Sequence, residues 1–154
     1  MTDEKRPLDP VDAMLEEALR ALSPRERQAL FRDLVRELRR RTQARITRQE
    51  APDGTPWPPR KRDARGRVRS RAKMLTGLRH ARRLHATSTP DGASLGYRGS
   101  TGRLAAVHHH GLRDRVSANG PTVAYPARPL LGLSPADRAW LRDRLLAHVT
   151  TSEG

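Results

Sequence analysis

PDGTPWPPRK, residues 52–61, divides this sequence into a helical half and a mixed half. Each of its four prolines lacks an amide donor and favours an extended backbone at the preceding residue. The segment therefore does not belong to the interior of a helix or a strand. Trp57 lies among the prolines as a large amphipathic side chain on a stiff backbone. Two interpretations stay open: a recognition arm that docks on a neighbour through Trp57, or a rigid surface linker whose tryptophan packs on its own domain.

Two helices are predicted before this segment. Apolar residues recur every three or four positions over residues 10–22, which predicts an amphipathic helix. The sequence SPRE at residues 23–26 then combines a capping box with a proline at the first helical position. A second helix should begin there and extend to about residue 49. The short connection predicts an antiparallel helical hairpin.

The second half of the chain mixes helix and strand signals. The predicted elements are a helix over residues 72–84, strands at 84–88 and 93–98 around a Pro-Asp-Gly turn, a helix over 104–110 ending at Gly111, a strand at 122–125, and a C-terminal helix from 135 to 149 after a Ser-Pro-Ala-Asp cap. We therefore expect one α+β domain. Its parts would be an N-terminal helical hairpin (1–50), a proline-rich arm with a basic loop (51–71), and an α+β core (72–154) with a small antiparallel sheet, packed helices and a C-terminal helix.

Composition excludes several classes of protein. The 154 residues suffice for one domain, but only 35% are hydrophobic, so the core should be lean. The absence of cysteine excludes disulfides and thiolate metal sites. No apolar run approaches the roughly 20 residues that span a bilayer, and the N-terminus lacks the pattern of a signal peptide. We expect a protein made in the cytoplasm that does not contact a membrane.

The net charge of +14 is concentrated in one stretch. Residues 60–83 carry 11 Lys/Arg against one Asp/Glu. Such a run raises affinity for any polyanion but gives no sequence specificity. The candidates for contact with a polyanion or an acidic partner are Arg65, Arg67, Arg69, Arg71 and Lys73.

Catalytic and metal-binding motifs are not found in the sequence. Three consecutive histidines, residues 108–110, would point about 100° apart on a helix, so they do not all face one ion, although two of them with a remote third ligand remain an alternative. The carboxylates lie chiefly in the first two helices and alternate with arginines, which is typical of solvated helix faces. We predict no catalytic residues, no metal and no cofactor. Sequence-specific reading of DNA is also not expected, because the second helix is nearly charge-balanced in its first half and the excess charge lies outside it.

Three stretches resemble a known family. They are RITRQEAPDGTPWPPRK at residues 45–61, GSTGRLAAVHHHGLRDRV at 99–116 and YPARPLLGLSPADRAWLRDRLLAHV at 125–149. In order and spacing they are similar to the tail-completion, or virion morphogenesis, family of contractile-tailed temperate phages. The resemblance implies a structural virion protein at the head-proximal end of the tail, made in the host cytoplasm and needed to join the tail to a DNA-filled head.

The resemblance also implies partners. We expect a homo-oligomer, a hexameric ring, in contact with tail tube, sheath or other neck and connector proteins and with passing genomic DNA. The suspected interface residues are Pro52, Trp57, Pro58, Pro59, Arg60, Lys61, His108, His109, Arg128, Pro129 and Leu130. A basic DNA-binding or DNA-packaging accessory protein is the alternative.

Overall fold

The computed structural model describes residues 10–60 and 73–151. Its elements are α1 (Pro10–Ala21), α2 (Pro24–Arg48), the 3-10 turn η1 (Thr76–Arg79), β1 (His85–Thr89), β2 (Gly92–Gly96), α3 (Gly99–His110), β3 (Arg113–Arg115), β4 (Thr122–Ala124) and α4 (Pro135–Thr151). The predicted α+β class with a C-terminal helix is confirmed. Among the described helices, none is both long and apolar enough to cross a bilayer.

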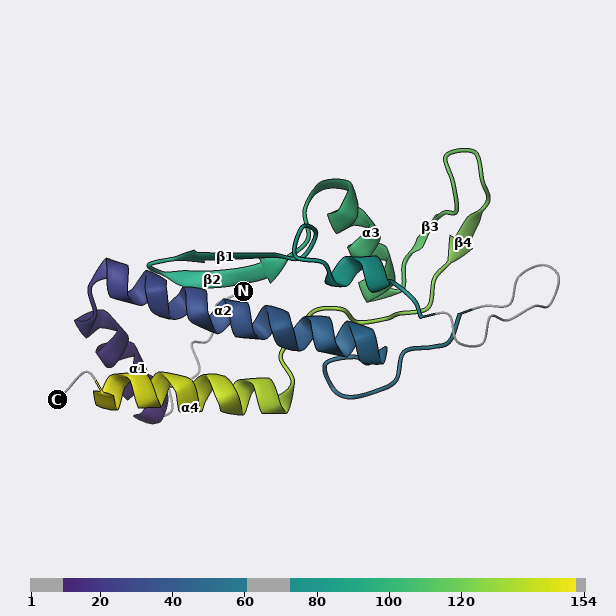
Figure 1. Ribbon diagram of the computed structural model, residues 1–154. Coiled ribbons are helices and arrows are strands. Elements are labelled where there is room, and N and C mark those ends of the chain that lie inside the picture. Colours follow the sequence, from purple (N-terminus) through teal and green to yellow (C-terminus); the bar gives the residue numbers. More distant parts are fainter. Residues whose placement is uncertain (1–9, 61–72, 152–154) are drawn as a thin grey trace, which may run out of the picture.

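Helix α2 is the central element, with the β1–β2 hairpin on one side and α4 on the other (Figure 1). The predicted capping box is present: the Ser23 hydroxyl accepts from the Glu26 amide at 3.2 Å, and the Glu26 carboxylate accepts from the Ser23 amide at 2.7 Å. The helix ends where Gln49 adopts a left-handed conformation with φ 61°. Both ends of this long helix therefore follow the sequence prediction.

The predicted β1–β2 hairpin is also confirmed, with Thr89 paired to Gly92 at its turn. Its tip is fixed to the start of α2, because Arg27 Nε donates to the Pro90 carbonyl at 3.0 Å and the Gln28 amide donates to the Ser88 carbonyl at 3.3 Å. The ribbon thus lies along α2 and covers one of its faces.

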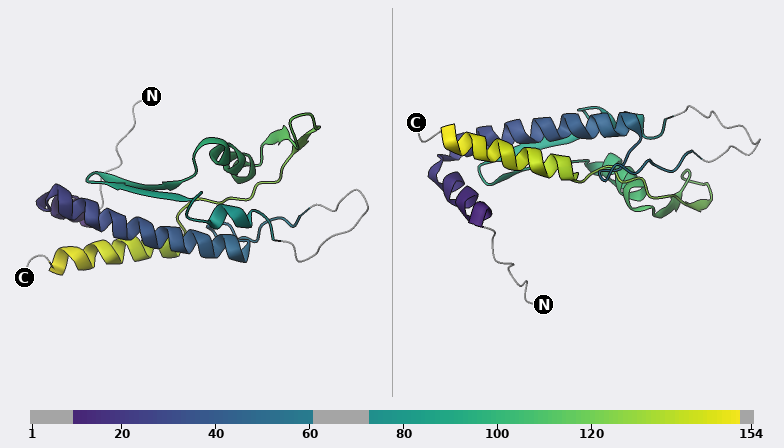
Figure 2. Two further views of the ribbon diagram at one scale, coloured as in Figure 1. Left: turned by 45° about the horizontal axis from the view of Figure 1, so that its top comes forward. Right: turned by 90° about the horizontal axis from the view of Figure 1, so that it is seen from below.

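Helix α1 follows a different course from a simple hairpin with α2. It leaves the start of α2 at an angle and packs on α4 (Figure 2). Leu15 is the buried residue of this short helix. The physical reason is that the β1–β2 hairpin and α4 already occupy two sides of α2, so the apolar stripe of α1 packs on α4 instead.

The helix predicted over residues 72–84 is wrong. Only one 3-10 turn, η1, forms in the described part of this range, because tertiary hydrogen bonds hold the preceding backbone out of a helix. The Gln49 side chain accepts from the Met74 amide at 2.6 Å and donates to the Met74 carbonyl at 2.9 Å. Leu75 then has φ 59°, which an α-helix does not permit.

Strand β3 was not predicted, and the described residues form two separate two-stranded sheets rather than one. β3 pairs with β4 in an antiparallel hairpin that contains Asn119 and Gly120 in its turn. An Asn-Gly pair is a common hairpin signal and could have revealed it. Gly111 ends α3 as predicted: its φ is +67°, and a Cβ there would lie 2.8 Å from the Ala127 nitrogen.

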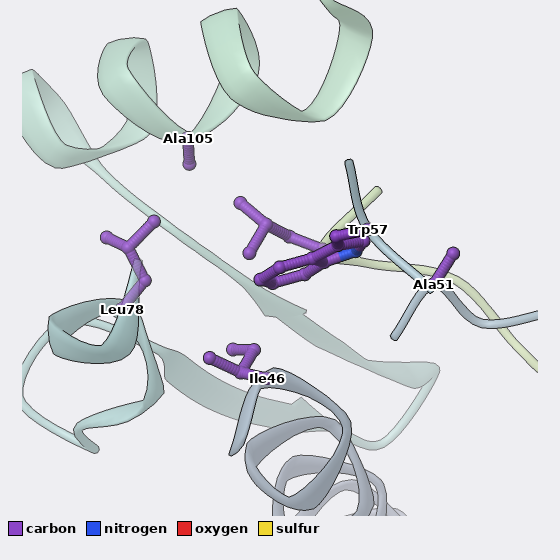
Figure 3. Packing of buried hydrophobic residues seen from close by; sticks show 6 residues of the cluster. Ile46, Ala51, Trp57, Leu78 and Ala105 are labelled. Atoms are coloured by element: carbon purple, nitrogen blue, oxygen red, sulfur yellow. The ribbon is translucent and has the colours of Figure 1, made fainter. Parts of the chain in front are cut away.

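The hydrophobic core lies near the C-terminal end of α2. Five segments distant in sequence contribute to it, and Trp57 lies at its centre (Figure 3). The buried members are Ile46, Ala51, Trp57, Leu78, Ala105 and Leu130.

Candidate assembly interface

The proline segment folds back on the end of α2 instead of extending as an arm. The amide of Ala51 donates to the Thr55 carbonyl at 2.9 Å, and the amide of Trp57 donates to the Gln49 carbonyl at 2.7 Å. Glu50 and Pro56 form an isolated antiparallel bridge. The expectation of an extended segment short of internal hydrogen bonds is therefore wrong, because the non-proline residues between the prolines close a compact loop.

Trp57 packs on its own domain, which is the second of the two interpretations that its sequence allowed. Its side chain is 7% exposed, and the indole nitrogen donates to the Pro129 carbonyl at 3.0 Å. Both its apolar surface and its polar group are satisfied within one chain. As an interface anchor, Trp57 is thus corrected to a core residue.

Arg128 fixes the two prolines that follow Trp57. Its guanidinium donates from Nε to the Pro58 carbonyl and from Nη2 to the Pro59 carbonyl, each at 3.0 Å. Burial lowers the pKa of Arg128. Arg128 and Leu130 are 2% and 1% exposed, so these two suspected interface residues also support the fold of the single chain.

The histidine pair holds the segment that carries Arg128 and Leu130. His109 Nδ1 accepts from the amides of Leu130 at 3.1 Å and Leu131 at 3.3 Å. The proton of the neutral ring is therefore on Nε2. Burial, and then the neighbouring His110, lower the pKa of His109. The imidazole acts as a fixed acceptor.

His108 is buried as well, so its suspected interface role is corrected too. Its ring meets Tyr125 edge to face with centroids 4.9 Å apart, and burial followed by the Arg128 charge lowers its pKa. Within the described residues, no three side chains of the metal-binding types gather.

The remaining predicted interface residues divide by exposure. Pro58, Pro59 and Arg60 are exposed, while Pro52 and Pro129 are half-buried. Lys73 is exposed, and its ammonium donates to the Thr47 carbonyl at 2.6 Å. The other predicted contact residues lie outside the described part of the chain: Lys61, Arg65, Arg67, Arg69 and Arg71.

A buried ion pair joins α2 to the start of α4, and no sequence pattern predicts it. Arg45 Nη1 lies 2.6 Å from Asp137 Oδ2, and the two side chains are 8% and 3% exposed. Burial opposes ionisation of Asp137, but hydrogen bonds from Ser134 and Arg45 outweigh it and lower the carboxyl pKa. The same carboxylate accepts from the Ser134 amide at 3.0 Å, so it caps α4 as well.

An apolar groove of about 420 Å³ runs between α2, β2 and α4. Leu141 and Leu145 of α4 are only half-buried along it, and Leu133 at its border is 40% exposed. The residues that line it are Phe31, Leu34, Val35, Leu38, Thr42, Ala93, Leu95, Leu131, Gly132, Leu133, Leu141 and Leu145. The periodicity of α4 identifies its inward residues but not how incompletely they are covered.

The two ends of the molecule differ in charge. The end with α1, the start of α2, the tip of the β1–β2 hairpin and the end of α4 carries six Lys/Arg and seven Asp/Glu, counted over residues 10–36, 87–94 and 143–151. The opposite end carries 17 Lys/Arg and five Asp/Glu, counted over residues 37–60, 73–86 and 95–142. The positive charge of the described residues is thus gathered at the end that holds α3 and the β3–β4 hairpin.

Large exposed apolar side chains also mark the two ends. Met14 on α1 is 47% exposed. At the opposite end, Leu104, Leu112 and Val116 are 46%, 45% and 60% exposed. These positions, like the charge pattern, were not identified as interface candidates from sequence, because their exposure depends on how α1 and the β3–β4 hairpin are placed.

Comparison with known proteins agrees with the resemblance seen in the sequence. Residues 7–150 match the phage virion morphogenesis family. Tail completion protein S of Escherichia phage P2 is 37% identical over 154 residues, which cover 97% of this chain and 99% of that protein. No solved structure matches the chain. The match extends over nearly the whole sequence, from α1 to α4, and the chain therefore belongs to the phage virion morphogenesis family.

Proposed function

We propose that this chain is the tail-completion subunit of a contractile-tailed phage, located at the head-proximal end of the tail and needed to join the tail to the head. The observation that carries the proposal is the full-length similarity to tail completion protein S. In this role the protein is structural and catalyses no reaction, and its place in the finished particle is the tail.

The surface of the chain supports a role in assembly. Exposed apolar side chains lie at both ends of an elongated molecule, and the positive charge is gathered at one of them. Apolar side chains that are exposed in one subunit become buried when subunits join, which stabilises the assembled state. We propose a closed ring, and six copies would match the sixfold symmetry of such tails. Its partners would be the tail tube, the sheath and the neck or connector proteins.

The test is a phage in which the gene for this chain is interrupted. We expect electron micrographs of the lysate to show DNA-filled heads and separate tails, because each is built without this protein but cannot be joined. Adding the purified protein to the lysate should restore infectious particles. Joined particles in the absence of the protein would contradict the proposal, and empty heads would point to DNA packaging instead.

The basic end of the molecule favours one alternative, a DNA-binding or DNA-packaging accessory protein. Tight binding of the purified protein to free duplex at physiological salt, with a steep salt dependence, would support it. The variant with Arg65, Arg67 and Arg69 changed to Glu separates the two roles. If the basic run contacts acidic faces of neighbouring proteins, this variant should fail to join tails to heads. In that case the unchanged protein should itself bind free duplex DNA only weakly.

A further inference from the structure

We propose that copies of this chain associate head to tail, with the acidic face of α1 on one copy docking on the arginine face of the β3–β4 hairpin on the next. This inference rests on the proposed ring function and names the two surfaces that form it. It follows from the charges and exposures of the two ends of the molecule, which complement each other.

The α1 surface is acidic and partly apolar. Asp12, Glu16 and Glu17 are exposed, and Arg20, the one basic residue of this helix, pairs with Glu16 at 3.2 Å. The apolar stripe around Leu15 faces α4, and Asp12 and Glu16 lie one helical turn apart at the border of this stripe, where both side chains are exposed. Exposed Met14 adds an apolar contact beside them.

The hairpin surface is basic. Side chains alternate along a strand, so Arg113 and Arg115 lie on one face together with their cross-strand partners Ala124 and Thr122. All four residues are exposed, whereas Asp114 points to the other face and pairs with Arg103 at 3.0 Å. The hairpin therefore presents two arginines with no carboxylate between them.

The spacing of the charges is compatible. Arginines two positions apart on a strand are separated by about 7 Å along it. Asp12 and Glu16, one helical turn apart, are separated by about 6 Å. Two arginine–carboxylate pairs can therefore form side by side, and guanidinium groups suit this geometry because they bind carboxylates in a bidentate manner.

A second copy is the occupant that the structure favours for both surfaces. The three views place α1 and the β3–β4 hairpin at opposite ends of the molecule, so one chain cannot bring them together (Figures 1 and 2). A contact between two different patches on identical subunits repeats from copy to copy and can close into a ring. Other polyanions could bind the hairpin, but only another copy supplies both the carboxylates of α1 and the next free hairpin.

A charge swap tests the contact. Asp12→Arg with Glu16→Arg, and separately Arg113→Glu with Arg115→Glu, should each weaken self-association more than about tenfold in sedimentation velocity, because like charges then face each other. An equimolar mixture of the two variants should associate again, since every contact in an alternating assembly is then complementary. Asp143→Arg, an exposed reversal on α4, is the matched control and should have no effect. Thermal unfolding by circular dichroism checks that each variant is folded.

Cross-linking provides a second test that does not need a stable oligomer. The chain has no cysteine, so Ala13→Cys on α1 combined with Thr122→Cys on the hairpin introduces the two reactive thiols. A short bismaleimide should then give a ladder of covalent multimers, whereas each single-cysteine variant should remain mostly monomeric. The ladder should disappear when Arg113 and Arg115 are also changed to Glu.

The outcomes distinguish the surfaces from the function. No ladder, or no restoration in the mixture, would overturn the proposed contact, and head–tail joining that still requires the protein would leave the proposed function intact. Dimers from the Ala13→Cys variant alone, formed as efficiently as the ladder, would show a twofold contact and also overturn the proposal. If tails join heads without the protein, the proposed function itself fails.

Discussion

The loop after α2 and the helix α4 differ in how deeply they bury their apolar side chains. Residues 49–57 form no helix or regular strand, yet this loop carries two of the buried core residues, Ala51 and Trp57. Helix α4 is regular over 17 residues, yet the one residue fully buried in it is Asp137. Regular backbone is therefore no guide to where this molecule is most tightly packed.

This lean sequence builds its core around one buried aromatic side chain. In the loop, the backbone of residues 49–57 closes on itself and places the indole in one buried cluster with Ile46 and Leu130, while Arg128 binds the carbonyls of Pro58 and Pro59. In α4, the backbone hydrogen bonds form within the helix itself. The helix can therefore persist although its apolar side chains are only partly covered. We therefore expect the buried indole to contribute more to stability than any single half-buried leucine of α4.

The largest effect should come from the loop. Trp57→Ala should lower the free energy of unfolding by about 3–5 kcal/mol, since it leaves a cavity at the centre of the core. Urea unfolding followed by circular dichroism measures this, with exposed Arg60→Ala as the control that should change stability by less than about 0.5 kcal/mol. A Trp57→Ala protein as stable as the unchanged chain, but unable to join tails to heads, would return Trp57 to an interface role.

A smaller effect is expected at the acceptor that holds the crossing segment. His109→Ala should cost about 1–3 kcal/mol, because the amides of Leu130 and Leu131 lose their partner. His109→Asn should recover much of this, since its side-chain oxygen can take the place of Nδ1. Similar losses in both variants would show that ring packing, rather than the acceptor, matters.

The same histidine should make stability depend on pH. Its pKa is lowered in the folded chain, so the unfolded chain binds the proton more readily. The stabilisation is present above the ordinary histidine pKa of 6.5 and is lost as the pH falls through and below it. The melting temperature should therefore drop on acidification, and less steeply in His109→Asn. Equal slopes in the two proteins would assign the acid sensitivity to other groups such as His108.

The smallest effect should come from α4. Leu145→Ala should cost only about 1 kcal/mol, because a half-buried leucine loses only part of its contacts. Exposed Ala139→Ser on the same helix is the control and should be near neutral. If Leu145→Ala were as damaging as Trp57→Ala, the groove would be closed in solution and the contrast between loop and helix would disappear.

Local signals predicted most of the regular elements. The Ser23 capping box, the turn around Asp91 and the helix stop at Gly111 each depend on a few neighbouring residues, and all three are present. The predicted helix at 72–84 failed because Gln49, distant in sequence, takes the Met74 backbone groups. Four of the suspected interface residues were misplaced for a similar reason, since their partners lie far along the chain: Trp57, His108, Arg128 and Leu130.

The family, the class of fold and the positions where helices and the first hairpin begin and end follow from the order of the amino acids alone. Such features arise from contacts between near neighbours and from strings long enough to be recognised. Which side chains are buried, and which surfaces remain exposed, depends instead on how the folded segments pack. Burial of Trp57, the Arg45–Asp137 pair and the separation of the acidic α1 face from the arginine hairpin depend on segments that are distant in sequence. Long-range packing of this kind has no counterpart in local periodicity, so it is read only from the folded chain.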